Sequence, residues 1–388
     1  MNIDMSMNTA ADGGCGMGST SAPLHGGPDA LGAPLHDFST NSNACGPCPE
    51  ALLSVQSADA SRYPDPAYTA LRARLADLHA VDPGRIVLAG SASEFIHRAT
   101  AFAARQGATC VELPAHSYGD YSHAAQAWGL GVIRSTPGGL PPQVALHWAC
   151  EPSSPLGVTD PALAAWREHG CAATALQVLD CAYAPLRLDG HRTEAPPTAW
   201  QLWTPNKALG LTGVRAAYAI APAHETPERI AALHGLAPSW PVGAHGVAML
   251  TAWAQPAVQQ WLHHSLATLR GWKAAQQALC TALGWRVVPG SLANYFVAQL
   301  SVAHVADACH TVDTSQAARA ADTAPSMQTA QWLRALRTHG IKLRDCNSFG
   351  LPGHVRLGVL APPAQQALAR AVHDVQRAAA TMPDPSNP

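Results

Sequence analysis

Along the first half of this chain, segments with apolar residues at helical spacing alternate with short continuous apolar runs that are typical of buried strands. Leu71, Leu75 and Leu78 follow the spacing of one helix face, and Pro83-Gly84 ends that pattern. Short apolar runs bounded by glycine or polar residues come next, each separated from the following run by a segment with helical spacing. The pattern predicts helices near 68–80, 94–105, 119–128 and 160–170, and strands near 86–90, 109–113, 131–134, 145–149 and 175–180.

Strands that alternate with helices at this spacing predict an α/β fold with a mainly parallel, doubly wound sheet. In such sheets ligands bind outside the carboxyl ends of the strands. Gly90, Asp180 and the segment around Lys207 lie at or just after predicted strand ends. We therefore expect these three places to converge on one site.

The second half of the chain has a different pattern. A long helical stretch begins near residue 259 and leads into two strand-like segments, 285–288 and 294–300, then a helix near 329–339 and a strand at 355–359. We interpret it as a smaller α+β domain. The expected organisation is a disordered leader at 1–21, an N-terminal arm at 22–60, a large domain at 61–265, a small C-terminal domain at 266–380 and a tail at 381–388. Within the small domain, residues 304–324 are rich in Ala, Thr and His and are expected to form a loop or insertion.

Composition narrows the classes of partner. The chain has 388 residues, 13% charged, with a net charge of −2, which gives no electrostatic argument for nucleic acid or an anionic membrane. No apolar run reaches transmembrane length, and the N-terminus lacks the basic and apolar regions of a secretory signal. The ten cysteines are scattered, and the pair Cys45 and Cys48 has neither a second pair nor a βαβ context. We expect a cytoplasmic protein without a metal site.

One lysine, Lys207, stands in the small, glycine-containing and otherwise apolar segment 203–215. Such a lysine is costly to bury as a cation, which favours its neutral amine as a nucleophile toward an aldehyde cofactor. In the same segment Thr204 and Arg215 supply a hydroxyl and a bidentate cation, which suit a cofactor phosphate. By itself the segment is equally compatible with a lysine at a loop edge beside a buried strand.

Other candidates have simpler alternatives of the same kind. Asp180 closes a buried strand, where a carboxylate needs a partner such as a protonated pyridine nitrogen, although an aspartate that caps the next turn is common. Tyr183 would contact a ring oxygen. Ser154 presents a hydroxyl from the rigid loop 151–157, which alone is only turn chemistry.

Residues that join predicted strands to helices are candidates for binding a phosphate and for stacking on a planar ring. Ser91 and Ala92 open a helix, whose N-terminus favours phosphate, although an N-cap serine explains Ser91 equally well. Tyr118 and Tyr121 would lay an aromatic face on a planar ring, or they are simply two half-buried aromatic side chains.

Arg344 and Arg356 each stand in an apolar, strand-like context. An arginine there stays charged and needs an anion, either from a structural ion pair or from a ligand. Two such residues in a chain with 26 acidic residues indicate a doubly anionic substrate as one alternative.

Taken in order, these segments resemble the fold-type-I aminotransferase superfamily of pyridoxal 5'-phosphate (PLP) enzymes, in the histidinol-phosphate aminotransferase branch. The likeness is greatest to the threonine-phosphate decarboxylases of cobalamin biosynthesis, and it runs from about residue 25 to 375. The segments that carry it are His25-Gly26-Gly27, 37–43, Tyr63-Pro64-Asp65, 180–183, 207–215, Asn294-Tyr295, Leu343-Arg344 and Val355-Arg356. The resemblance implies an aspartate aminotransferase-like fold and a homodimer with a shared active site.

The resemblance also implies a role for each candidate residue. Lys207 would form the covalent link to PLP and move protons, Asp180 would pair with the pyridinium nitrogen and Tyr183 would contact the ring oxygen. The residues expected at the cofactor phosphate are Ser91, Ala92, Thr204 and Arg215, with Tyr63 from the second subunit. Tyr118 would stack on the ring and Ser154 would stand at its oxygen. The residues expected to bind a small phosphorylated amino-acid substrate are Arg356 at the carboxylate, and His25, Asn43 and Arg344 at the phosphate.

The chain departs from the family pattern at several positions. Ser154 replaces an asparagine that contacts the ring oxygen, Cys181 replaces a glutamate, Asn206 stands where a hydroxyl is usual and Ala44 replaces a proline. The expected function is decarboxylation of O-phospho-L-threonine to aminopropanol phosphate. The alternatives are an aminotransferase of the histidinol-phosphate type and a PLP-fold protein without turnover.

Overall fold

The computed structural model describes residues 26–135, 144–170, 174–191, 193–300 and 324–380. The leader, His25, nearly all of the segment 304–324 and the tail 381–388 lie outside the described residues. Within the described ranges, no helix is both long enough and apolar enough to cross a bilayer.

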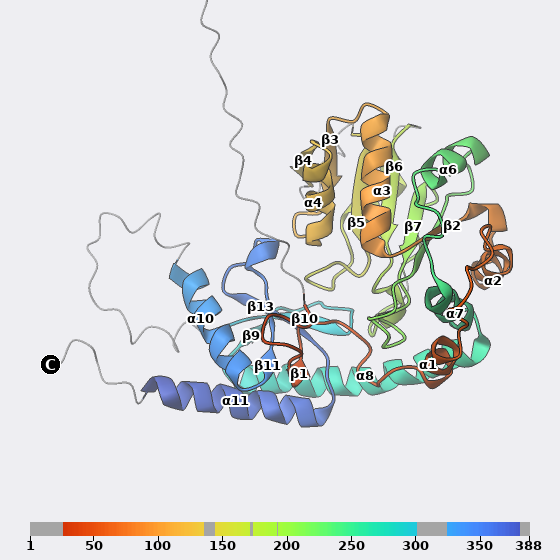
Figure 1. The fold of residues 1–388 in the computed structure, drawn as a ribbon. Helices are drawn as coiled ribbons and strands as arrows, with labels where there is room; N and C mark the ends of the chain where they lie inside the picture. The colour runs from red at the N-terminus through yellow and green to blue at the C-terminus, as the bar shows by residue number, and fades with distance from the viewer. Residues whose placement is uncertain (1–25, 136–143, 171–173, 192, 301–323, 381–388) are drawn as a thin grey trace, which may run out of the picture.

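The larger of two main layers is a seven-stranded sheet in the order β2-β8-β7-β6-β5-β3-β4 (Figure 1). All neighbours pair in parallel except β8, which is antiparallel to both β2 and β7. The strands are β2 (Ile86–Ala89), β3 (Cys110–Leu113), β4 (Gly131–Arg134), β5 (Leu146–Cys150), β6 (Leu176–Asp180), β7 (Ala199–Trp203) and β8 (Ala217–Ile220). The predicted mainly parallel sheet is therefore confirmed, and β7 and β8, on either side of Lys207, were missing from the prediction.

Helices cover both faces of this sheet because alternate strand residues are apolar on each side. Val87 and Ala89 pack with one set of helices, whereas Ile86 and Leu88 pack with the other. The first set is α3 (Ala92–Arg105), α4 (Gly119–Ala127) and α6 (Pro227–His234), and the second is α1 (Pro49–Gln56), α2 (Thr69–His79), α5 (Ala162–His169), α7 (Ala244–Trp253) and the start of α8 (Pro256–Ala282). The doubly wound arrangement is confirmed.

The smaller layer is the antiparallel sheet β12-β13-β10-β9, packed against α8, α10 (Ala324–Thr338) and α11 (Pro362–Ala380). Its strands are β9 (Arg286–Val287), β10 (Tyr295–Gln299), β12 (Arg344–Asp345) and β13 (His354–Gly358). Helix α8 passes beneath both sheets in Figure 1 and crosses the proposed boundary at residue 265 without a break.

The first part of the N-terminal arm lies beside the smaller layer, whereas its helix α1 packs on the large sheet. Its strand β1 (His36–Asp37) pairs in parallel with β11 (Ile341–Lys342), close to β12 in sequence. The arm then continues through residues 38–43 toward the Lys207 segment, where the backbone N–H of Asn43 donates to the Lys207 carbonyl at 2.9 Å. The arm thereby connects the two sheets.

Candidate active site

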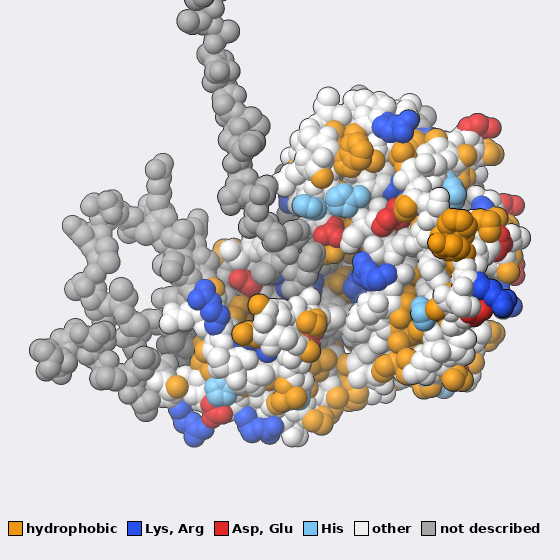
Figure 2. Space-filling model, viewed as in Figure 1, with side chains coloured by type: hydrophobic (Ala, Val, Ile, Leu, Met, Phe, Trp, Pro, Cys, Tyr) orange, Lys and Arg blue, Asp and Glu red, His pale blue; other side chains and the backbone are white. Residues whose placement is uncertain are grey.

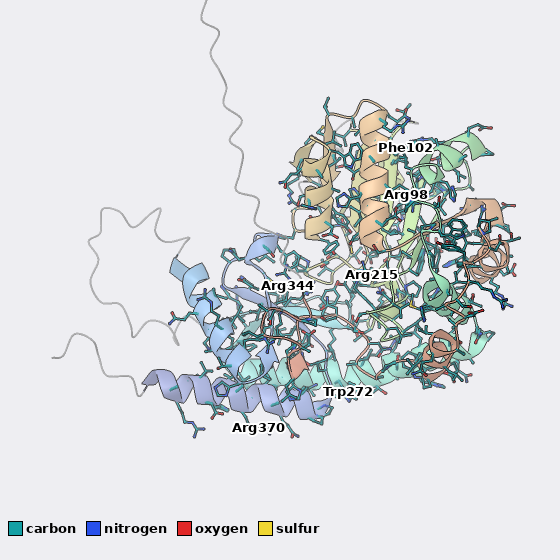
Figure 3. The ribbon with its side chains drawn as sticks, viewed as in Figure 1. Arg98, Phe102, Arg215, Trp272, Arg344 and Arg370 are labelled. Carbon is teal, nitrogen blue, oxygen red and sulfur yellow. The ribbon has the colours of Figure 1, made fainter. Side chains whose placement is uncertain are left out.

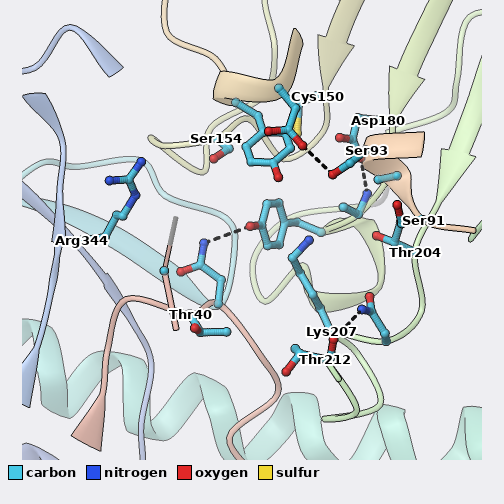
Figure 4. A pocket seen from close by; sticks show the side chains of 18 of the residues that line it. Thr40, Ser91, Ser93, Cys150, Ser154, Asp180, Thr204, Lys207, Thr212 and Arg344 are labelled. Atoms are coloured by element: carbon cyan, nitrogen blue, oxygen red, sulfur yellow. Dashed lines mark hydrogen bonds between the residues drawn. The ribbon is translucent and has the colours of Figure 1, made fainter. Parts of the chain in front are cut away.

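A cavity of about 340 Å³ lies between the carboxyl ends of the large sheet and the small sheet. It is lined from the N-terminus of α3, the loops after β5, β6 and β7, strands β12 and β13, and the arm. Figure 4 shows Lys207 between two ends, with Ser91 and Thr204 on one side and Arg344 on the other. The predicted convergence of the three strand-end segments is observed.

Lys207 lies on the turn that follows β7 and is half-buried. Its Nζ lies 4.9 Å from the centroid of the Tyr183 ring. The turn needs glycine at position 210. Its φ of +69° lies in the left-handed region, and an added Cβ would lie only 2.6 Å from the Gly46 carbonyl oxygen, so larger side chains are excluded. The arm therefore packs directly on the loop that presents the lysine.

Asp180 ends β6 with 4% of its surface exposed. Its Oδ2 accepts a hydrogen bond from the Tyr121 hydroxyl at 2.7 Å, and its Oδ1 accepts one from the Ala182 amide at 2.9 Å. Burial raises the pKa of Asp180, while the charge of Lys207 and the two hydrogen bonds oppose the rise. Asp180 therefore does cap the turn that follows β6, as the simpler alternative expects. A cation placed beside this carboxylate would stabilise its charged form.

The end of the cavity near α3 has the groups that a phosphate needs. Ser91 is the N-cap of α3, with its Oγ accepting from the Glu94 amide at 3.1 Å, so the capping interpretation of Ser91 is correct. Helix α3 nevertheless points its N-terminus at the cavity, which favours an anion. The Thr204 Oγ1 is buried and has no hydrogen-bond partner.

Arg215 completes this end of the cavity. It lines the cavity, and no carboxylate of the described chain lies within ion-pair distance of its guanidinium. Figure 3 places Arg215 and Arg344 in the region between the two sheets. An unpartnered hydroxyl, a helix N-terminus and an arginine fit a phosphate, and the nearby Lys207 and Asp180 fit an aldehyde and a ring nitrogen. The residues present therefore fit PLP.

The residues expected around a ring are also at the cavity. Tyr118 lies edge-on to Tyr121, with ring centroids 5.9 Å apart, and burial raises the pKa of Tyr118, which keeps its hydroxyl protonated. The Tyr183 hydroxyl accepts from the Asn41 amide at 3.3 Å. Ser154 reaches the cavity as well, but its hydroxyl accepts from Arg356 at 3.1 Å.

The other end of the cavity holds two buried arginines on paired strands, with Arg344 opposite Arg356 in the register. Each is 6% exposed, and each guanidinium carbon lies over the Phe349 ring, at 4.7 and 5.5 Å. Burial, and then the charge of Arg356, lower the pKa of Arg344 to about 10. Among the described residues neither arginine has an acidic partner, so the structural ion-pair alternative is wrong for this part of the chain.

Two candidate residues lie away from the cavity. The Asn43 side chain donates to the Ala208 carbonyl at 3.0 Å and to the Ser265 hydroxyl at 2.8 Å, so it supports the Lys207 loop instead of facing a substrate phosphate. Tyr63 is 78% exposed and stacks on Trp240 at the surface, with ring centroids 4.5 Å apart. Its expected contact with a second subunit stays a prediction.

Sequence reasoning missed Asn41, which lines the cavity two positions before Asn43. Its side chain is 1% exposed, and its Oδ1 has no partner. The motif 37–43 contained both asparagines, and only the path of the backbone decides which one turns inward. Asn294 and Tyr295 support the walls: Asn294 donates to the Ser42 carbonyl at 3.1 Å, and Tyr295 donates to the Ser153 carbonyl at 2.8 Å.

Comparison with known proteins agrees with this geometry. A histidinol-phosphate aminotransferase from Jannaschia sp. (strain CCS1) is 26% identical over 345 residues, covering 84% of this chain and 87% of that protein. The solved histidinol-phosphate aminotransferase from Clostridium acetobutylicum has a TM-score of 0.69 at 17% identity, over 89% of this chain and 100% of that one. The solved L-threonine-O-3-phosphate decarboxylase from Porphyromonas gingivalis has a TM-score of 0.65 at 19% identity, over 88% and 99%.

At these identities the two structures establish the fold alone. The sequence model of the family "Aminotransferase class I and II" matches residues 33–375, which include both sheets and every cavity-lining residue except Gly26. The chain therefore belongs to the aminotransferase class I and II family of PLP-dependent enzymes.

Proposed function

We propose that this enzyme decarboxylates O-phospho-L-threonine to aminopropanol phosphate, a reaction of cobalamin biosynthesis. The observation that carries the proposal is the pair Arg344 and Arg356, both buried at the cavity without acidic partners in the described chain. The cost of burying two neighbouring cations is offset when a ligand brings two anionic groups. O-Phospho-L-threonine carries a carboxylate and a phosphate on a short carbon chain.

The residues present give each group a place. Arg356, held by Ser154 and by the Ser39 carbonyl at 3.1 Å, would bind the carboxylate, and Arg344 would bind the phosphate. PLP, when bound, supplies the electron sink that stabilises the carbanion left by the departing group. Lys207, whose Nζ faces the Tyr183 ring, would deliver the proton that replaces the carboxylate on Cα. Phe349 lines this end of the cavity, and the Arg356 guanidinium lies over both the Phe349 ring and the Tyr295 ring, at 5.5 and 5.4 Å.

The outcome depends on which bond at Cα stands perpendicular to the cofactor ring. If Arg356 holds the Cα–carboxylate bond in that direction, CO2 leaves. If the Cα–H bond stands there, Lys207 removes the proton and the enzyme transaminates. The opening motif 25–43 and Asn294-Tyr295 favour decarboxylation.

The second candidate is an aminotransferase of the histidinol-phosphate type. The named relatives favour it, since the Jannaschia protein that matches 84% of this chain is a histidinol-phosphate aminotransferase. Histidinol phosphate carries a phosphate but no carboxylate, so it would engage Arg344, and Arg356 would serve the carboxylate of the keto acid that accepts the amino group. A protein without turnover is the third candidate, motivated by Ser154 and Cys181, and the intact Lys207 and Asp180 oppose it.

The proposal includes a homodimer and a cytoplasmic location. A homodimer is supported by the surface position of Tyr63, which would reach the cofactor phosphate of a second copy. The cysteines that the structure describes are free thiols, most of them buried, which supports a reducing cytoplasm.

A mass-spectrometric product assay tests the proposed reaction. Purified protein with PLP is incubated with O-phospho-L-threonine and no keto acid, beside a Lys207→Ala control. Aminopropanol phosphate that accumulates over many turnovers, and only with Lys207 present, is the expected result. One stoichiometric conversion of the cofactor to its pyridoxamine form would establish the aminotransferase instead. A protein that shows no visible cofactor absorbance after PLP is added would rule out both enzymes.

A further inference from the structure

The described part of the N-terminal arm begins at the wall of the cavity. Gly26 lines the cavity, and a Cβ added to it would collide with the Ser39 carbonyl oxygen, so the two backbones are in close contact. The Gly27 amide donates to the Ser39 hydroxyl at 3.0 Å. The same Ser39 carbonyl accepts from Arg356 Nη2 at 3.1 Å. The turn at Gly26 and Gly27 therefore packs on the residue that orients Arg356.

A small charge cluster fastens this turn to the smaller layer. Asp29 pairs with Arg337 of α10, through two hydrogen bonds of 3.0 and 3.1 Å, and with Lys342 of β11 at 3.0 Å. Lys342 also donates to the Gly27 carbonyl at 2.5 Å, and Arg337 donates to the Gly32 carbonyl at 2.8 Å. Both cations thus hold the arm by its backbone as well as by Asp29.

Asp29 is needed because these two cations lie close together. Their side chains are 12% and 15% exposed, and Asp29 is the carboxylate of the described chain within ion-pair distance of either. Without its charge Arg337 and Lys342 would repel each other, and the contact of Lys342 with Gly27 would weaken. The hydrogen bonds from Arg337 and then Lys342 hold the pKa of Asp29 well below its usual range, so the cluster stays charged at neutral pH.

We propose that Asp29 is a positioning residue for the carboxylate end of the substrate site. It acts through a continuous chain of contacts, from Lys342 to Gly27, from Gly27 to Ser39 and from Ser39 to Arg356. The inference rests on the proposed role of Arg356 as the substrate carboxylate clamp. Asp29 itself stays outside the cavity lining.

The test compares two phosphorylated amines, one with a carboxylate and one without it, which also differ by one methyl group. O-Phospho-L-threonine has the carboxylate and O-phosphoethanolamine lacks it, and the affinity of each for the PLP-loaded enzyme is measured from the change in cofactor absorbance. We expect Asp29→Asn to weaken O-phospho-L-threonine binding roughly three- to tenfold and O-phosphoethanolamine binding less than about twofold. Asp29→Glu is expected to restore most of the affinity. Asp374→Asn, which removes an exposed carboxylate paired with Arg377, is the matched control and is expected to change neither.

Amide hydrogen exchange across residues 26–40 gives an independent readout in the same variants. Faster exchange there in Asp29→Asn alone, together with the selective loss of affinity, supports the proposal. Equal loss for both ligands, a fall in kcat without a change in KM, or unchanged exchange would each overturn it. If the wild-type enzyme binds neither ligand, the proposed substrate class is wrong, and the exchange data then decide whether Asp29 holds the arm against Ser39.

Discussion

Arg356 Nη1 donates a hydrogen bond to the Ser154 hydroxyl at 3.1 Å and thereby joins the small sheet to the loop after β5. Ser154 stands where the family pattern has an asparagine. Its hydroxyl oxygen accepts from Arg356, which leaves the serine O–H as a donor, and the Tyr183 hydroxyl, which accepts from Asn41, is a second donor at the cavity. The serine at position 154 therefore helps to hold Arg356, the arginine that we propose binds the substrate carboxylate.

Ser154→Ala is therefore expected to loosen Arg356 more than it affects PLP binding. Loss of a hydrogen bond to a charged group predicts a rise of roughly tenfold in the KM for a carboxylate-bearing substrate, with cofactor affinity nearly unchanged. Ser153→Ala is the neighbouring control, because the Ser153 hydroxyl is buried without a partner. Steady-state kinetics and PLP titration measure both effects, and equal results for the two variants would contradict the role given to Ser154.

Tyr121→Phe is expected to weaken cofactor retention through Asp180. The Tyr121 hydroxyl stabilises the charged carboxylate, so its removal raises the pKa of Asp180 further above its usual range. As the pH falls, protonation of Asp180 removes its attraction for a protonated ring nitrogen, and PLP affinity falls with it. In the variant this fall is expected to begin at a higher pH.

A PLP titration across a pH series measures that shift. Tyr68→Phe is the control, since its hydroxyl donates to the Val242 carbonyl at 2.8 Å, outside the cavity lining. Superimposable pH curves for wild type and Tyr121→Phe would show that Asp180 does not depend on this hydrogen bond.

Gly210→Ala is expected to destabilise the lysine loop. The residue has a φ of +69°, and its added Cβ would lie 2.6 Å from the Gly46 carbonyl oxygen. We expect a loss of about 2 kcal/mol or more in the free energy of unfolding, and reduced visible cofactor absorbance because Lys207 is displaced. Gly213→Ala, with nothing within 4 Å of its Cβ, is expected to behave like wild type. Thermal unfolding with absorbance spectra distinguishes the two, and a wild-type melting temperature for Gly210→Ala would refute the close approach.

Arg344→Gln is expected to show which of the two anionic groups of the substrate Arg344 binds. Loss of this cation predicts a fall in affinity for O-phospho-L-threonine of roughly 10- to 100-fold, while the weaker binding of L-threonine, which lacks the phosphate, changes little. Arg370→Gln, on the exposed side of α11 in Figure 3, is the control. Parallel losses for both ligands would mean that Arg344 does not select the phosphate.

On the face shown in Figure 2, acidic, basic and apolar side chains are interspersed, and no continuous area of one charge is visible there. The net charge of −2 had already removed the electrostatic argument for nucleic acid.

The sequence by itself determined much of the larger layer and identified several residues that line the cavity. The spacing of apolar residues and the positions of strand ends are local features of the sequence. The bounds of β2 to β6 and of the helices between them were therefore predicted within a few residues. Lys207, Asp180, Thr204 and Arg215 were identified for the same reason, because each stands next to a predicted buried strand or in a short apolar segment.

Tertiary structure alone decided which distant side chains meet. The arm strand β1 pairs with β11, Arg356 reaches Ser154, and Asn41 turns inward in place of Asn43, although each contact joins segments remote in the sequence. Local propensity carries no information on such pairs, because the irregular backbone path through a loop sets which of two nearby side chains faces the cavity. The two arginines show the same limit: their apolar sequence context requires an anion, and only the folded chain shows that no described carboxylate lies within ion-pair distance of either guanidinium.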